Sequence, residues 1–124
     1  TNNAKLGILH GAAAYVCQNS EGQINDTESI SAGLDYPGVS PIHCFLKDVK
    51  RARYTSATDE AALSAYKLVT KLEKINPSLE PSHAFAEAIK IAPKLNKDTI
   101  IIVNSCGDAK KDRDILKARL GKIN

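Results

Sequence analysis

The sequence predicts an α/β fold in which helices form layers around a parallel sheet. Residues 100–103 (IIIV) are β-branched and apolar on both faces, which is typical of a central parallel strand covered by helices on both sides. Two stretches of helical periodicity precede this run and a basic helical stretch follows it, so the elements fit a layered αβα arrangement. In such sheets ligands bind beyond the carboxyl ends of the strands, so residues 104–108 are the first place to look for a site.

The first third of the chain is predicted to be strand and loop. Residues 1–40 are rich in Gly and Pro, and residues 14–18 form a short β-like run before a polar turn. Pro41 is suited to the first turn of a helix, and apolar residues then recur at helical spacing, which predicts a helix near 41–50. Residues 53–57 are predicted to form a short strand, and the α/β region spans 41–124.

Two amphipathic helices are predicted in the middle of the chain. Thr58 is a suitable N-cap, and the carboxylates that follow it favour the positive end of a helix dipole. The apolar stripe of this first helix consists of Leu63, Tyr66, Val69 and Leu72. A second helix is predicted between Pro81 and Pro93, and a final basic helix covers about 110–119.

The composition is that of one soluble globular domain spanning residues 1–124. The 124 residues are 43% hydrophobic and 25% charged, with a net charge of +3. The charges are interspersed, so no nucleic-acid partner is expected, and no apolar run approaches the roughly 20 residues that a membrane span needs. Three widely spaced cysteines favour a reducing compartment, which makes a cytoplasmic location the expectation. Since the chain has no Met, we expect it to be a processed product or a piece of a longer chain.

Four stretches resemble one known family. They are LHGAAAYVCQNSEGQI (9–24), SISAGLDYPGVSP (29–41), TDEAALSAYKLV with LEPSHAFAEA (58–69 and 79–88), and IIIVNSCGDAKKD (100–112). SISAGLDYPGV is the most specific of them, because so long a run has little chance of arising in an unrelated fold. Together they resemble the C-terminal part of the tryptophan synthase β chain, a fold type II pyridoxal 5′-phosphate (PLP) enzyme.

The resemblance implies an activity for a longer parent chain. That family joins L-serine and indole into L-tryptophan by β-elimination and β-replacement, with PLP as electron sink. Its Schiff-base lysine and phosphate-binding loop lie upstream of residue 1, so the isolated chain is expected to be inactive and to bind no PLP. The family also implies a tryptophan synthase α subunit as partner. A domain cut from a larger chain exposes apolar surface, so self-association is expected.

The resemblance assigns roles to two carboxylates. Asp35, in the GLDYP stretch, matches an acidic residue that faces the substrate and helps to close the site; alternatively it holds a Gly/Pro turn through local hydrogen bonds. Glu80 matches a glutamate beside the cofactor ring, and it is also placed to interact with a helix N-terminus. Both roles of Glu80 are compatible.

Cys106 falls where most family members have a Ser that hydrogen-bonds the pyridine nitrogen of PLP. A neutral thiol is a weaker donor but leaves that nitrogen unprotonated as well. A shift of one residue gives the role to Ser105, and the third alternative is that Cys106 is a small core residue. Gly107 retains the first glycine of the family's cofactor-binding run, whereas Asp108 replaces its arginine, which makes the chain a divergent member.

Weaker assignments complete the site. His10 falls where the family lines the passage for indole, and the backbone carbonyls of Tyr36 and Gly38 align with a monovalent-cation site. His83 is expected to be structural, and Lys110 and Lys111 are expected to be solvated charges at a helix start. A non-catalytic remnant or binding module of the same fold is the alternative to an enzyme segment.

Overall fold

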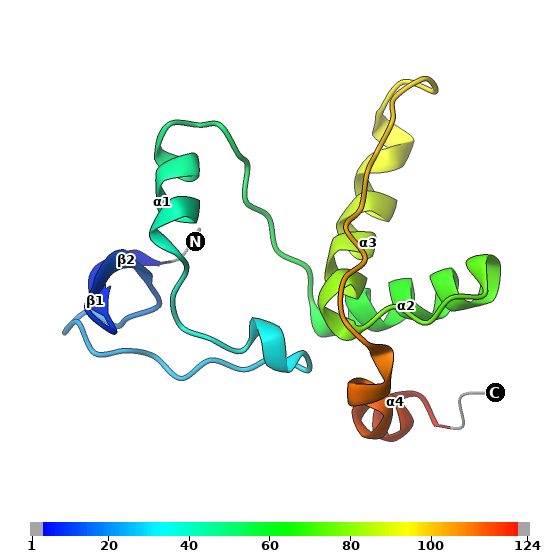
Figure 1. Cartoon of the computed structure of the whole chain (residues 1–124), viewed down its shortest axis with the longest axis horizontal. Coiled ribbons are helices and arrows are strands. Elements are labelled where there is room, and N and C mark those ends of the chain that lie inside the picture. The colour runs from blue at the N-terminus through cyan, green and yellow to red at the C-terminus, as the bar shows by residue number, and fades with distance from the viewer. Residues whose placement is uncertain (1–3, 122–124) are drawn as a thin grey trace. The chain divides into compact units, whose positions relative to one another are not determined.

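The structure, a computed structural model, describes residues 4–121 and divides them into two compact units (Figure 1). The first unit comprises residues 4–29 and 33–55, and the second comprises residues 30–32 and 56–121. Each unit has its own hydrophobic cluster. No helix among the described residues is both long and apolar enough to cross a membrane.

The first unit is built on a β-hairpin. Strands β1 (Lys5–Leu9) and β2 (Ala12–Val16) pair antiparallel, with Leu9 opposite Ala12. The two residues between the strands, His10 and Gly11, have φ angles of 50° and 78°. Positive φ at both positions is what a tight turn needs to match the twist of the two strands, and glycine adopts it at little cost.

Helix α1 (Pro41–Asp48) packs against this hairpin. The Ser40 hydroxyl accepts a hydrogen bond from the Ile42 amide at 3.2 Å, and Pro41 occupies the first turn, so both local signals favour a helix start here. The helix predicted near 41–50 is therefore confirmed. The buried residues of this unit are Ala14, Val16 and Cys44, with Leu9, Tyr15 and Val39 packed against them. A short 3-10 helix, η1 (Ala32–Leu34), precedes α1.

Helix α2 (Asp59–Glu73) opens the helical part of the second unit at the predicted N-cap. The Thr58 hydroxyl accepts a hydrogen bond from the Ala61 amide at 3.3 Å. The backbone amide of Glu60 and the Thr58 hydroxyl both hydrogen-bond the Glu60 carboxylate, which lowers its pKa. The cap of α2 is thus formed by neighbours in sequence.

Helix α3 (Leu79–Ile91) packs against α2 and continues into the 3-10 helix η2 (Ala92–Lys94). It begins two residues before Pro81, whereas the sequence predicts a helix that begins after Pro81. The predicted final helix is a 3-10 turn, η3 (Ala109–Asp112), followed by α4 (Arg113–Leu120). The core of this unit consists of Ile30, Tyr66, Leu79 and Leu116, with Leu63, Ile115 and Leu120 packed against it.

The two strands predicted at 53–57 and 100–103 are wrong for residues 4–121. Both segments are irregular, and the only sheet among these residues is the β1–β2 hairpin. Ile100 and Ile102 are 86% and 90% exposed rather than buried. A β-branched run forms a central strand only when strands on either side accept and donate its backbone hydrogen bonds, and residues 4–121 supply none there. The α/β class holds, without the predicted parallel sheet.

The exposed run at 100–103 generates a prediction about association. We expect the 124-residue chain to self-associate at high concentration, because an unpaired apolar segment is a template for pairing with another chain. Ile102→Lys should shift the weight-average mass in sedimentation equilibrium toward the 13.4 kDa monomer. Leu72→Lys, at an exposed α2 position, is the matched control. A wild-type chain that remains monomeric at high concentration would contradict the prediction.

Candidate functional site

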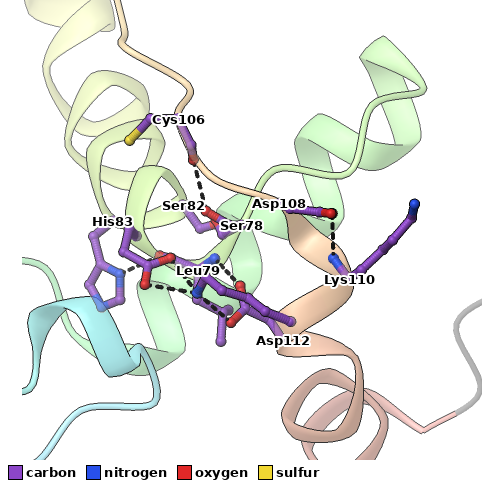
Figure 2. Close-up of polar contacts among 10 residues, drawn as sticks. Ser78, Leu79, Ser82, His83, Cys106, Asp108, Lys110 and Asp112 are labelled. Atoms are coloured by element: carbon purple, nitrogen blue, oxygen red, sulfur yellow. Dashed lines mark hydrogen bonds and ion pairs between the residues drawn. The ribbon is translucent and has the colours of Figure 1, made fainter.

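The predicted site residues fall into one group in each unit. His10, Asp35, Tyr36 and Gly38 belong to the first unit, and Glu80, Ser105, Cys106 and Gly107 belong to the second. In the second unit Glu80 lies in the first turn of α3, and Cys106 and Gly107 lie against Ser78 at the N-terminus of that helix; Figure 2 shows the Cys106 contact.

A buried carboxylate caps the N-terminus of α3. The Asp112 side chain is only 3% exposed, and its Oδ2 accepts a hydrogen bond from the Leu79 amide at 2.8 Å (Figure 2). Ser78 occupies the N-cap position but makes no side-chain cap. Leu79 is fully buried, so its amide needs a protein acceptor in place of water. Sequence reasoning missed Asp112, since the residue lies 33 positions from the amide that it caps.

The Ser78 hydroxyl instead holds the segment that carries Cys106. It donates a hydrogen bond to the Cys106 carbonyl at 2.9 Å, as Figure 2 shows. Gly107 follows with a φ of +88°, and a Cβ at this position would lie 2.7 Å from the Ser78 hydroxyl oxygen. Any larger residue would therefore have both a strained backbone and a clash. Glycine at 107 lets residues 106–107 approach α3 closely.

Cys106 and Ser105 are both exposed, so the alternative of Cys106 as a core residue is wrong. The thiol forms no hydrogen bond with any part of the chain that the structure describes. It is therefore free to donate to a ligand, as is the neighbouring hydroxyl.

Glu80 is paired with a lysine. The Lys111 ammonium donates to both carboxylate oxygens of Glu80 at 2.8 Å and to Asp112 Oδ1 at 2.7 Å. Partial burial lowers the pKa of Lys111, but the hydrogen bonds to Asp112 and Glu80 outweigh it, so the net pKa lies above the usual value. The expectation that Lys111 is merely a solvated charge is wrong.

His83 has the structural role expected from the sequence. Its Nδ1 lies 2.7 Å from the Leu79 carbonyl, which can only accept, so the proton is on Nδ1. Its Nε2 lies 3.7 Å from Asp59 Oδ1 on α2. The side chain is 14% exposed and bridges the first turns of α2 and α3.

The first unit brings two of its predicted residues together. The Tyr36 hydroxyl and His10 Nδ1 are 2.7 Å apart, and their rings are tilted by 52°. Gly38 forms a β-bridge with Val16, which fixes the backbone beside Tyr36. Asp35 is exposed, and among residues 4–121 its carboxylate accepts no hydrogen bond, so no local turn contact accounts for it. Residues 4–121 contain no cluster of three His, Cys, Asp or Glu side chains suited to a metal ion.

An open pocket of about 620 Å³ lies beside Gly107 in the second unit. Three cationic side chains line it, and none of the three has a salt bridge within residues 4–121: Lys110, Arg113 and Lys117. Asp108 also lines the pocket, but its Oδ1 accepts a hydrogen bond from the Lys110 amide. Tyr66 and Leu116 contribute apolar surface, so the pocket combines positive charge with an apolar wall.

Comparison with known proteins gives close relatives over nearly the whole chain. No family model matches the sequence. The tryptophan synthase β chain of Bordetella petrii is 51% identical over 117 residues, which is 94% of this chain and 29% of the relative. Those of Allorhizobium ampelinum (55% over 106 residues) and Chromobacterium violaceum (51% over 112 residues) cover 86% and 90% of this chain, and 26% and 28% of their own lengths.

Similarity of this kind relates the chain to tryptophan synthases. More specifically, the chain is a homologue of part of the tryptophan synthase β chain, and it spans less than a third of the length of the curated relatives that it matches.

The capping carboxylate generates a stability prediction. Asp112→Ala leaves the buried Leu79 amide without an acceptor, so we expect a loss of about 2 kcal/mol in the free energy of unfolding. Urea unfolding followed by circular dichroism measures it. Asp114→Ala, at an exposed position in the first turn of α4, is the control and should cost under about 1 kcal/mol. Equal losses in the two variants would show that the cap is not required.

Proposed function

We propose that this chain is the C-terminal part of a PLP-dependent tryptophan synthase β chain, which joins L-serine and indole into L-tryptophan. The observation that carries the proposal is the identity of about half over 94% of the chain with a β chain of that name. When bound, PLP supplies the electron sink for β-elimination and β-replacement.

The second unit would supply one edge of the cofactor site. The donor set fits an aromatic ring with a nitrogen acceptor, because the Cys106 thiol and Ser105 hydroxyl are exposed. Gly107 would let the ring approach the backbone, since its own approach to Ser78 depends on having no side chain. Glu80 would stand beside the ring as a carboxylate already satisfied by Lys111.

The first unit would supply groups for the substrates. Asp35 is exposed and unbound by local contacts, which suits a carboxylate that meets L-serine and helps to exclude water. His10, hydrogen-bonded to Tyr36, would line the passage for indole. The backbone carbonyls of Tyr36 and Gly38 would hold a monovalent cation, a kind of site that tolerates changes of side chain.

Several properties of the whole enzyme follow from the same proposal. The Schiff-base lysine and phosphate loop would come from residues outside this chain, so the chain alone would neither bind PLP nor catalyse the reaction. The 100–103 run would be a central strand of the parallel sheet of a fold type II domain once its partner strands are present. A tryptophan synthase α subunit would be the partner in the cytoplasm.

A chimera tests the proposed function. The matching segment of the Bordetella petrii β chain is replaced by this chain, and L-tryptophan formation from L-serine and indole is measured with PLP present. We expect activity, and we expect Cys106→Ala to lower kcat about tenfold, because one hydrogen bond to the cofactor ring is lost. Cys106→Ser should retain activity, since a hydroxyl is the better donor.

Cys17→Ala, a partly buried thiol of the first unit, serves as the matched control. A chimera that folds and binds PLP but forms no L-tryptophan would overturn the proposal. If activity then appears only with Cys106→Ser and Asp108→Arg together, the chain is a non-catalytic remnant of the fold.

The pocket beside Gly107 favours a second candidate function, that of a binding module for small organic anions. Its cationic side chains, unpaired within residues 4–121, would attract a carboxylate, and Tyr66 and Leu116 would contact an apolar group.

Benzoate is the probe for this candidate. We expect saturable chemical-shift changes in NMR spectra at Lys110, Arg113 and Lys117. Arg113→Gln should raise the apparent Kd about fivefold, corresponding to ~1 kcal/mol. Arg119→Gln lies on the same helix but not in the pocket wall, and should leave the Kd unchanged. Shifts that do not saturate, or that spread over the whole chain, would rule the binding module out.

A further inference from the structure

Lys111 hydrogen-bonds two carboxylates, those of Glu80 and Asp112, which belong to different elements of the second unit. Its ammonium lies 2.8 Å from both oxygens of Glu80, on the first turn of α3, and 2.7 Å from Asp112 at the end of η3. Its side chain is 43% exposed and that of Glu80 is 21% exposed. Lys110, the neighbouring lysine, makes no such contact within residues 4–121.

Asp112 fixes the position of the Lys111 ammonium. Asp112 is buried and its Oδ2 is bound to the Leu79 amide, so its Oδ1 presents a fixed acceptor to Lys111. Leu79 directly precedes Glu80. The contacts therefore close a ring that runs from the Leu79 amide through Asp112 and Lys111 to the Glu80 side chain and back along the backbone.

This ring of contacts restricts the orientation of the Glu80 carboxylate. An ion pair between partly exposed side chains contributes modestly to folding stability, because water solvates both charges in the unfolded chain. A long glutamate side chain has several rotamers available to it. Two short hydrogen bonds from one ammonium select a single one and favour the charged carboxylate over the protonated one.

We propose that Lys111 is a positioning residue that holds the Glu80 carboxylate in one orientation at the start of α3 and favours its charged form. The contacts that support this proposal are all within this chain. The proposed function is needed only for the consequence, which is that the charged carboxylate lies beside the aromatic cofactor.

The test compares Lys111→Met with Lys110→Met in the 124-residue chain. The titration of the Glu80 side chain is followed by ¹³C NMR of its carboxyl carbon as the pH is lowered. We expect Lys111→Met to move the Glu80 midpoint to higher pH by about one unit, a tenfold change in proton affinity, because the opposite charge is gone. Lys110→Met should leave the midpoint unchanged. Lys111→Arg keeps the charge and should restore the wild-type midpoint.

A structural role alone would not move this midpoint, so the outcome is decisive. A folded Lys111→Met chain with an unchanged Glu80 midpoint overturns the proposal. If Lys111→Met does not fold, Glu80→Gln is used instead, and the pKa of Lys111 is read from its ¹³Cε shift. That pKa should fall, since the Glu80 hydrogen bonds raise it, and an unchanged value again overturns the proposal.

Neither readout requires PLP, substrates or activity. An inactive chimera would therefore leave this inference standing, and an unchanged Glu80 titration would leave the proposed function standing.

Discussion

The second unit depends on one hydrogen bond, from the buried Leu79 amide to the carboxylate of Asp112. A helix leaves its first amides without partners inside the helix, and a buried amide cannot turn to water instead. Asp112 supplies the acceptor and adds a negative charge at the positive end of the helix dipole. The start of α3 is therefore tied to η3, which lies more than thirty residues further along the chain.

Ser78, at the N-cap position of α3, does not provide the local cap that a serine there commonly provides. Ser78 sits at the N-cap position, yet its hydroxyl donates to the Cys106 carbonyl instead of accepting from the helix. The second oxygen of Asp112 is likewise free to hold Lys111, which holds Glu80. One carboxylate thus organises both the loop that carries Cys106 and the charge beside it.

The sequence predicted the parts of the fold whose causes are local. Thr58 caps α2 through an amide three residues away, and Pro41 opens α1, so neighbouring residues sufficed to place both helices. The strands predicted at 53–57 and 100–103 failed, because a strand is defined by its partners and none pairs with them in residues 4–121. The start of α3 at Leu79 could not be predicted either, since its cap comes from a distant segment.

In the candidate site too, some features were predictable from the sequence and others depend on contacts between distant segments. Resemblance of motifs selected Glu80, Cys106 and Gly107, and the structure brings Cys106 and Gly107 against the first turn of the helix that carries Glu80. Neither periodicity nor spacing could indicate that Lys111 meets Glu80, because the two residues are separated by 31 positions and only the fold brings them together.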